Sequence, residues 1–550
     1  MRSRLETVHP SSALEGIDVT TPPLTSRTRM TARVAALLLL GTAAVAGWWV
    51  VTSPHDDSPP PAPHHDAEPP HDANPWRPAV HLAPSSGWMN DVQRPVWADG
   101  EWHLYNLVNG DYPEGNGTSW QHATSDDLVH WEPRGTAIEK YHNGLGDVES
   151  GSVVVDEHDT AGFGAGTLVA IATQQLDGVQ RQSLFYSRDG GDTFTSYDGN
   201  PVLDNPGSGD FRDPKVIWDE SRRQWVMALA EGDKIGFYSS PDLKTWTYLS
   251  DFQRDDLGTL ECPDLFPMAV DGDPNRIRWV LAASANGSGY GRSTGYAYWV
   301  GDWDGTGFTP DDASPQWLDQ GDDFYAAVTW PDSRATAAAQ LQQRYAIGWM
   351  NNWAYADEVP GVPSKGGFNS LVRSIRLEDV DGRSTLTSRL ADDAGQGVEP
   401  VTGTTGTVRG TTTLFNTAET SYRLHLRFAA TDAREVRVRV RAADGTSMTV
   451  GYDARQQHAF LSRDTDAVAG GMPEAYRRIQ TGPTAPGPDG TISLDLVMDG
   501  GATEAYFDDT GTSFASLVFL GSGTRAIEVE PVDGTTRVEA AELTPLSPDS

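Results

Sequence analysis

The segment WHLYNLVN at residues 102–109 is the first of five short apolar stretches that recur every 54 to 66 residues. The other four are TLVAIATQ at 167–174, WVMALA at 225–230, WVLAAS at 279–284 and YAIGWMN at 345–351. Each has the length and composition of a buried strand. Such a period is typical of four-stranded sheets arranged around an axis, so the sequence predicts an all-β chain in which residues 75–390 form a five-bladed β-propeller.

A recurring turn supports this repeat. It follows the first three stretches as SDDL at 125–128, SRDG at 187–190 and SPDL at 240–243. Each copy leads to an aromatic residue, which is Trp131, Phe194 or Trp246. Asp, Gly and Leu at these positions predict a tight turn between outer strands, and we expect the aromatic rings to pack between neighbouring sheets.

The repeat is lost in the C-terminal part of the chain. Sequences such as LHLRF at 424–428 and VRVRV at 436–440 alternate apolar and polar residues, as strands with one buried face do. The sequence therefore predicts a β-sandwich over residues 395–548.

The N-terminal region contains a candidate export segment. Residues 1–33 form a region whose end is basic, and the 18 residues at 34–51 are uncharged, which is near the minimum for a membrane-spanning helix. We interpret residues 34–52 as a signal peptide or as a signal-anchor that would leave one membrane anchor. Residues 53–74 are rich in Pro, His and Asp and are predicted to be a disordered linker. The rest of the chain is then extracellular or at the outer face of the cell membrane.

Composition excludes several functions. The formal net charge of −36 would repel nucleic acid and anionic lipid headgroups, so no nucleic-acid partner is expected. Cys262 is the only cysteine, which excludes an intramolecular disulfide and a cysteine-rich metal site. The histidines between residues 55 and 71 fall in the Pro-rich stretch, and we predict neither a metal site nor a cofactor.

Three carboxylates precede strands of the repeat. Asp91 lies 11 residues before the first stretch, Asp213 lies 12 before the third, and Glu261 lies 18 before the fourth. If each acid opens the innermost strand of its blade, closure of the ring brings all three to one axis. Glycoside cleavage needs one protonated and one ionised carboxyl, and crowding of acids separates their pKa values. The spacing therefore predicts a glycosidase site.

At these motifs the chain resembles glycoside hydrolase family 32, which includes invertases, levanases, inulinases and fructan transferases. The resemblance covers roughly residues 78–545 and rests on WMND at 88–91, FRDP at 211–214, ECPD at 261–264, DFYAA at 323–327 and IGWMNNW at 347–353. It implies a β-fructofuranosyl substrate and retention of configuration. Asp91 would attack the anomeric carbon and Glu261 would act as acid and base, while Asp213 and Arg212 would bind ring hydroxyls.

The resemblance also suggests residues that bind the substrate. We expect Trp88 and Tyr325 to stack on a furanose ring, and Trp120 either to do the same or to pack inside a blade. The full candidate set is Trp88, Asn90, Gln93, Trp120, Glu149, Ser150, Arg212, Asp323 and Tyr325.

Three positions depart from the family pattern. The usual Pro-Asn-Gly after the first acid is Val92-Gln93-Arg94-Pro95 here, and the family's glutamine on the first inner strand falls at Leu107. Both changes resemble the levan-acting branch. Glu149 stands in place of an aromatic residue before Ser-Gly-Ser and adds a fourth acid to the pocket. Glu149 is expected to bond a substrate hydroxyl, to pair with Arg212 or another cation, or to weaken catalysis by raising the pKa of the nucleophile.

Four interpretations of the function follow. The preferred one is an exported, retaining β-fructosidase that cleaves fructan, with levan as the favoured polymer. A levan fructotransferase that closes a cyclic difructose dianhydride would use the same residues. An inverting arabinan hydrolase on a five-bladed fold would hold its acids farther apart, and the sandwich argues against it. A fructan-binding propeller that has lost catalysis through Glu149 is the non-enzymatic alternative.

Overall fold

A computed structural model describes residues 76–360, 366–391, 398–429 and 432–548. Within these residues strands dominate, with one short helix, α1 (Ala337–Gln340), and 3₁₀ turns at Ser288–Tyr290 and Glu474–Arg477. The predicted export segment at 34–52, the region before it and the linker at 53–74 lie outside the described residues. Within the described ranges, no helix is long and apolar enough to cross a membrane.

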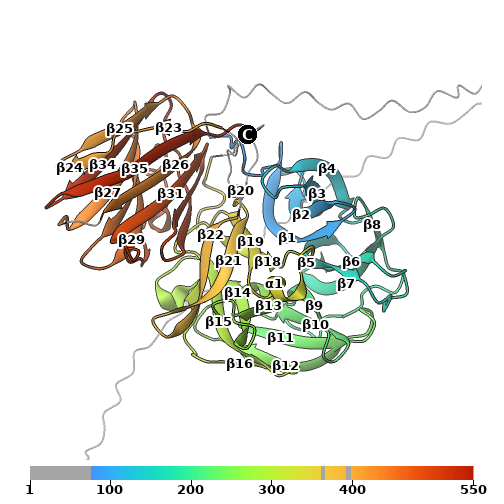
Figure 1. Cartoon of the computed structure of the whole chain (residues 1–550). Helices are drawn as coiled ribbons and strands as arrows, with labels where there is room; N and C mark the ends of the chain where they lie inside the picture. The colour runs from blue at the N-terminus through green and yellow to red at the C-terminus, as the bar shows by residue number, and fades with distance from the viewer. Residues whose placement is uncertain (1–75, 361–365, 392–397, 430–431, 549–550) are drawn as a thin grey trace, which may run out of the picture. The chain divides into compact units, whose positions relative to one another are not determined.

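Five antiparallel sheets follow one another along the first part of the chain (Figure 1). The first consists of β1 (Trp88–Ala98), β2 (Glu101–Asn109), β3 (Ser119–Ser125) and β4 (Glu132–Ile138). The second consists of β5 (Asp147–Asp156), β6 (Thr167–Leu176), β7 (Val179–Ser187) and β8 (Phe194–Ser196). The third consists of β9 (Arg212–Asp219), β10 (Gln224–Ala230), β11 (Lys234–Ser240) and β12 (Thr247–Gln253).

The last two sheets each carry one additional short strand. The fourth consists of β13 (Leu260–Ala269), β14 (Ile277–Ala285), β15 (Gly295–Trp303) and β16 (Phe308–Pro310), with β17 (Gln316–Trp317) on β15. The fifth consists of β18 (Tyr325–Trp330), β19 (Arg344–Met350), β21 (Arg373–Val380) and β22 (Arg383–Leu390), with β20 (Phe368–Asn369) on β19. All five predicted apolar stretches are second strands of these sheets, as β2, β6, β10, β14 and β19.

The first strands of the five sheets close a ring. β1 contacts β5, β5 contacts β9, β9 contacts β13, β13 contacts β18, and β18 contacts β1. Apolar clusters fill the spaces between adjacent sheets, and the cluster that joins the fifth sheet to the first contains Trp102, Leu104, Trp330 and Ile347. Burial of one large apolar side chain contributes about 1.5–3 kcal/mol, so these clusters hold the ring closed without a disulfide.

The predicted turns have a common geometry. The last residue of each motif, Leu128, Gly190 or Leu243, has a positive φ, of 70°, 78° and 61° respectively. In the first copy the hydroxyl of Ser125 accepts a hydrogen bond from the backbone N–H of Leu128 at 2.8 Å. As predicted, Trp131, Phe194 and Trp246 pack against the apolar clusters.

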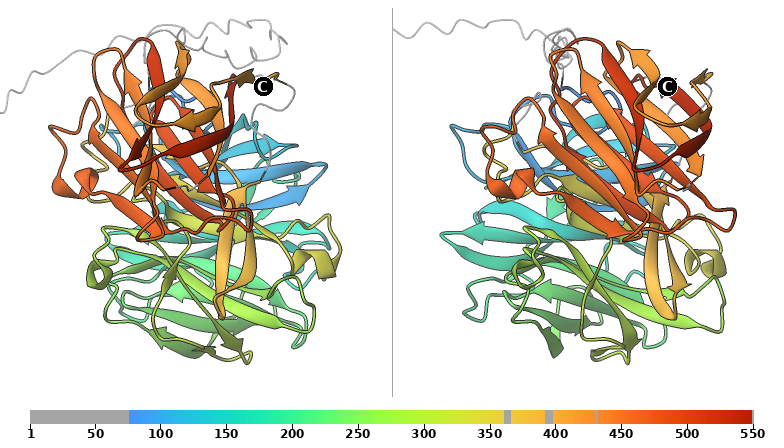
Figure 2. Two further views of the ribbon diagram at one scale, coloured as in Figure 1. Left: turned by 60° about the vertical axis from the view of Figure 1, so that its left-hand side comes forward. Right: turned by 90° about the vertical axis from the view of Figure 1, so that its left-hand side faces the viewer.

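Two further sheets form the C-terminal sandwich, whose layers are drawn in orange and red in Figure 2. One contains β23 (Val401–Thr402), β24 (Gly406–Val408), β26 (Ser421–Ala429), β31 (Thr491–Asp499), β32 (Ala502–Phe507), β33 (Thr512–Leu517) and β35 (Thr536–Pro545). The other contains β25 (Thr412–Thr417), β27 (Glu435–Ala442), β28 (Ser447–Asp453), β29 (His458–Thr465), β30 (Gln480–Pro483) and β34 (Arg525–Val532). The apolar residues of the two alternating segments are buried in one core.

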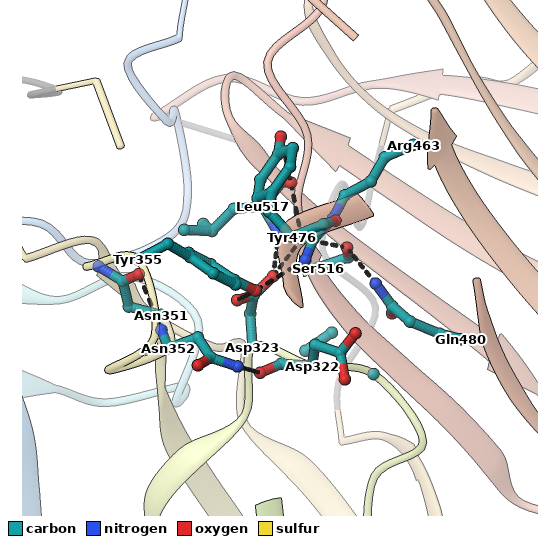
Figure 3. Close-up of polar contacts among 12 residues, drawn as sticks. Asp322, Asp323, Asn351, Asn352, Tyr355, Arg463, Tyr476, Gln480, Ser516 and Leu517 are labelled. Atoms are coloured by element: carbon teal, nitrogen blue, oxygen red, sulfur yellow. Dashed lines mark hydrogen bonds and ion pairs between the residues drawn. The ribbon is translucent and has the colours of Figure 1, made fainter. Parts of the chain in front are cut away.

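A buried ion pair joins Asp323, which lies just before β18, to Arg463 of the sandwich (Figure 3). The carboxylate of Asp323 accepts hydrogen bonds from Arg463 at 2.5 Å, from the Tyr355 hydroxyl at 2.5 Å and from the backbone N–H of Leu517 at 2.8 Å. The guanidinium of Arg463 also lies 3.9 Å from the centroid of the Tyr476 ring. Since both oxygens of the Asp323 carboxylate accept hydrogen bonds and its charge is paired with Arg463, burial of this charged group is tolerated.

Candidate active site

A bulge near the start of each first strand shapes the site. In β1, Asn90 and Asp91 together oppose the single residue between the pairs Met89–Val108 and Val92–Asn106. The same one-residue shift falls between Val148 and Gly151, Arg212 and Lys215, Glu261 and Asp264, and Tyr325 and Val328. Because a bulge bends a strand and redirects its side chains, five bulges around one axis build a common floor for a site.

The three predicted acids lie at these bulges but at successive positions. Glu261 directly precedes the bulge of β13, Asp213 is the first bulge residue of β9, and Asp91 is the second bulge residue of β1. Each acid therefore lies at or next to the bulge near the start of its strand. The three acids do not occupy equivalent positions in the bulge, because each is shifted by one residue from the next. Asp213 has a φ of 63° and Cys262, at the same bulge position in β13, has a φ of 46°. Non-glycine residues adopt this conformation only where their surroundings impose it.

Asp91 is held by neighbours on three strands. Its carboxylate accepts hydrogen bonds from the Ser150 hydroxyl at 2.5 Å and from the Asn90 amide at 3.2 Å, and the Cys262 thiol lies at 3.5 Å. The side chain of Gln93 donates to the backbone carbonyl of Asp91 at 3.2 Å. Burial raises the pKa of Asp91, while the bond from Ser150 lowers it. These bonds favour the ionised carboxylate that a nucleophile requires.

Arg212 connects the other two acids. Its guanidinium donates to Glu261 at 3.1 Å and lies 3.9 Å from Asp213, which also accepts a bond from the backbone N–H of Cys262 at 3.0 Å. Burial raises the pKa of Asp213 to about 7, although the positive charge of Arg212 opposes this shift. The hydroxyl of Tyr325 donates to the other oxygen of Glu261. The carboxyl of Glu261 is thus fixed in position by one cation and one phenol.

The acids surround a pocket of about 500 Å³. One wall is aromatic, because Trp88 stacks on Trp353 with 6.2 Å between ring centroids and lies 5.5 Å from the ring of Tyr112. The lining also contains the polar residues Asp147, Glu149, Gln175, Gln180 and Arg212. Aromatic rings for sugar C–H groups together with polar groups for hydroxyls suit a carbohydrate.

Glu149 is one of the residues that line this pocket. Its carboxyl accepts a hydrogen bond from Gln180 at 3.2 Å, and the amide oxygen of Gln180 accepts one from Arg212 at 3.4 Å. Gln180 therefore lies between Glu149 and Arg212. A direct pair with Arg212, one of the expected roles of Glu149, is replaced by this bridge through Gln180. Burial, together with the charges of Asp147 and Asp213, raises the pKa of Glu149 to about 8.

Four residues of the candidate set, Gln93, Trp120, Asp323 and Tyr325, do not line the pocket. Trp120 has no exposed surface and packs in the cluster between the first two sheets, with its indole N–H bonded to the carbonyl of Glu149. Asp323 has no exposed surface either, because it binds Arg463 of the sandwich. For Trp120 the structure thus shows packing inside a blade, one of its two expected roles, while Asp323 contacts the sandwich. Tyr325 is 2% exposed and bonds Glu261 through its hydroxyl, and Gln93 bonds the backbone of Asp91, so both contact the acids from outside the pocket lining.

Sequence reasoning missed several residues that line the pocket. Tyr112, Gln180 and Asp147 lie in segments that carry no motif. Trp353 closes the IGWMNNW motif and is 47% exposed, so its place at the end of the motif was the available signal. Among the residues that the structure describes, no group of three His, Cys, Asp or Glu side chains is placed to hold a metal ion.

Family comparison agrees with this geometry. The model of the glycosyl hydrolases family 32 N-terminal domain matches residues 81–388, and that of the family 32 C-terminal domain matches residues 382–545. The chain belongs to glycosyl hydrolase family 32. This family 32 chain is a glycosidase that acts on β-fructofuranosides. The family, the enzyme class and the cleavage of β-fructofuranosyl linkages predicted from the sequence are confirmed.

Relatives of the family 32 chain include two bacterial enzymes. The levanbiose-producing levanase of Bacillus subtilis (strain 168) is 41% identical over 456 residues, which cover 81% of this chain and 86% of that one. The levanbiose-producing levanase of Geobacillus stearothermophilus is 46% identical over 385 residues, or 68% of this chain and 95% of that one.

Solved family 32 structures have the same fold. The exo-inulinase from Aspergillus awamori superposes with a TM-score of 0.77 at 28% identity, covering 86% of this chain and 99% of that one. The β-fructofuranosidase from Schwanniomyces occidentalis complexed with fructosyl-erythritol gives 0.74 at 27% identity, covering 86% and 98%. The predicted all-β fold, a five-bladed propeller followed by a sandwich, is confirmed.

Proposed function

We propose that this chain is an exported levanase that hydrolyses β-fructofuranosyl linkages with retention and releases levanbiose. The convergence of Asp91, Asp213 and Glu261 on one pocket around Arg212 carries the proposal. The levanbiose-producing relatives, at 41% and 46% identity, support levan as the polymer. The proposal of export rests on the uncharged segment at residues 34–51. It is supported by the extracellular exo-inulinase of Aspergillus awamori, which is among the relatives of the chain.

Asp91 is the nucleophile in this proposal. Its ionised carboxylate, bonded by Ser150 and Asn90, attacks the anomeric carbon of the fructosyl unit and forms a covalent ester. Glu261 donates its proton to the departing glycosidic oxygen. It then removes a proton from water, which attacks the ester and releases the sugar with its original configuration. The proton lost from Glu261 is thereby restored.

Asp213 and Arg212 bind the fructosyl ring hydroxyls. Both side chains are held before substrate arrives, Asp213 by the Cys262 N–H and Arg212 by Glu261, so little reorganisation is needed as charge develops. Hydrogen bonds to an ionised group strengthen when the sugar becomes an oxocarbenium ion, which stabilises the transition state more than the bound substrate.

Trp88, Tyr112 and Trp353 form the platform for the polymer. Their rings make one wall of the pocket and Trp353 extends the platform to the protein surface, since nearly half of its area is exposed. A chain of fructosyl units could stack along this wall while one linkage lies at the acids.

The proposal is tested by the products of the purified protein on levan, inulin and sucrose, separated by chromatography. Levanbiose from levan, with slower cleavage of inulin and sucrose, is expected. Free fructose as the first product would contradict the assignment of the product, a cyclic dianhydride would show transfer in place of hydrolysis, and binding without turnover would make the chain a lectin. Asp91→Asn should lower kcat by a factor of about 10³ or more, whereas Asp99→Asn, in an exposed turn of the same sheet, should not.

A further inference from the structure

Arg94 lines a second pocket on the propeller. It follows Asp91 by three residues and lies at a second irregularity of β1, where the register shifts between Gln93 and Val96. This pocket has a volume of about 340 Å³ and shares no lining residue with the active-site pocket. The Nε of Arg94 is buried and has no hydrogen-bond partner among the described residues.

The surroundings of Arg94 carry an excess of positive charge. Arg94, Lys215 and Arg344 all lie within electrostatic range of one carboxylate, Asp264. Lys215 is 3.0 Å from Asp264, and Arg344 donates to the hydroxyl of Thr329, which in turn donates to Asp264. Burial lowers the pKa of Lys215 to about 8 and that of Arg344 to about 10. Three cations around one acid leave buried charge that needs a counter-charge.

The walls of the second pocket are largely aromatic. They include four tryptophans, Trp97, Trp102, Trp218 and Trp225. Glu157 is the one acid in this lining and is exposed. Aromatic walls, an arginine without a hydrogen-bond partner at its Nε in the described part of the chain and surplus positive charge match a small, weakly hydrated anion.

We propose that the second pocket binds a small monovalent inorganic anion beside the guanidinium of Arg94. Such an ion offsets the surplus charge around Asp264. Arg94 is the only arginine or lysine among the described residues that line this pocket, so the site depends on this residue. The anion is a structural ligand of the ring and takes no part in the cleavage proposed above.

Chloride is the first probe. Thermal unfolding of the purified protein is followed in sodium chloride and in sodium gluconate at equal ionic strength, which separates specific binding from screening. At a chloride concentration ten times its dissociation constant, Tm should rise by about 1.4 °C relative to gluconate. Arg94→Met should abolish this difference, while Arg455→Met, at an exposed arginine, should keep it.

Bromide provides a direct measurement that does not depend on any variant. Crystals of the wild-type protein grown in sodium bromide should show an anomalous peak in this pocket within hydrogen-bond distance of Arg94. A chloride response that persists in Arg94→Met, or wild-type crystals without a bromide peak in this pocket, would overturn the proposal. Neither result would bear on levan cleavage, which has its own assay.

Discussion

Replacing Glu149 with glutamine tests the electrostatics of the pocket. The carboxyl of Glu149 has a pKa of about 8 in the folded protein, raised by burial and by Asp147 and Asp213, against an ordinary value of 4.5. The folded state therefore binds this proton more tightly than the unfolded state does. The contribution of Glu149 to the free energy of unfolding is therefore fully present below about pH 4.5 and is lost as the pH rises toward 8.

The size of this loss follows from the two pKa values. One pH unit of difference corresponds to 1.36 kcal/mol, so Glu149 costs about 1 kcal/mol at pH 5 and about 3 kcal/mol at pH 7. Glutamine keeps the shape and does not titrate. The free energy of unfolding of Glu149→Gln should therefore exceed that of the wild type by about 2 kcal/mol more at pH 7 than at pH 5.

Urea unfolding at pH 5, 6 and 7, followed by tryptophan fluorescence, measures this difference. Glu419→Gln, at an exposed glutamate of the sandwich, is the matched control and should show no such trend. If Glu149→Gln and the wild type differed by the same amount at all three pH values, Glu149 would be ionised in the folded protein and the reasoning would be refuted.

Three further substitutions separate the roles of other residues. Ser150→Ala removes a hydrogen bond that favours ionised Asp91, so kcat/KM on levan should fall about tenfold at acidic pH. The acidic limb of the pH-rate profile should move to higher pH, and an unmoved limb would contradict this. Arg463→Met leaves Asp323 buried and unpaired, so the free energy of unfolding from denaturant titration should fall by about 3–5 kcal/mol. The folded variant should keep its kcat/KM, and an inactive folded variant would show that Asp323 acts in the active site. Trp353→Ala should raise KM for levan about threefold to tenfold with kcat retained, and an equal KM would remove this ring from the platform.

The sequence was most informative where a pattern repeats. Each apolar stretch must be buried between two sheets, so its period reports the blade, and the acids before three of them had to meet once the ring closed. Turn motifs such as SDDL also repeat. Each copy forms the same turn between outer strands, with a positive φ at its last residue, Leu128 or Leu243. These features depend on local chemistry and on the number of blades, both of which can be read from residue order.

The direction of a side chain was harder to predict. Trp120 lies on β3, which directs its ring into the core, whereas Trp353 lies in the segment after β19 and is exposed. The role of Asp323 depends on Arg463, which lies 140 residues away on the sandwich. The bulges that offset Asp91, Asp213 and Glu261 by one residue each become visible only in the strand register.

The claim that Asp91 and Glu261 act on the two sides of one linkage is tested most directly by trapping the intermediate. Glu261→Gln is mixed with β-fructosyl fluoride, whose leaving group needs no proton donor, quenched, digested and examined by mass spectrometry. Because this variant cannot activate water, a fructosyl ester should accumulate on the peptide that contains Asp91. An unmodified Asp91, or an ester on Asp213, would contradict the account.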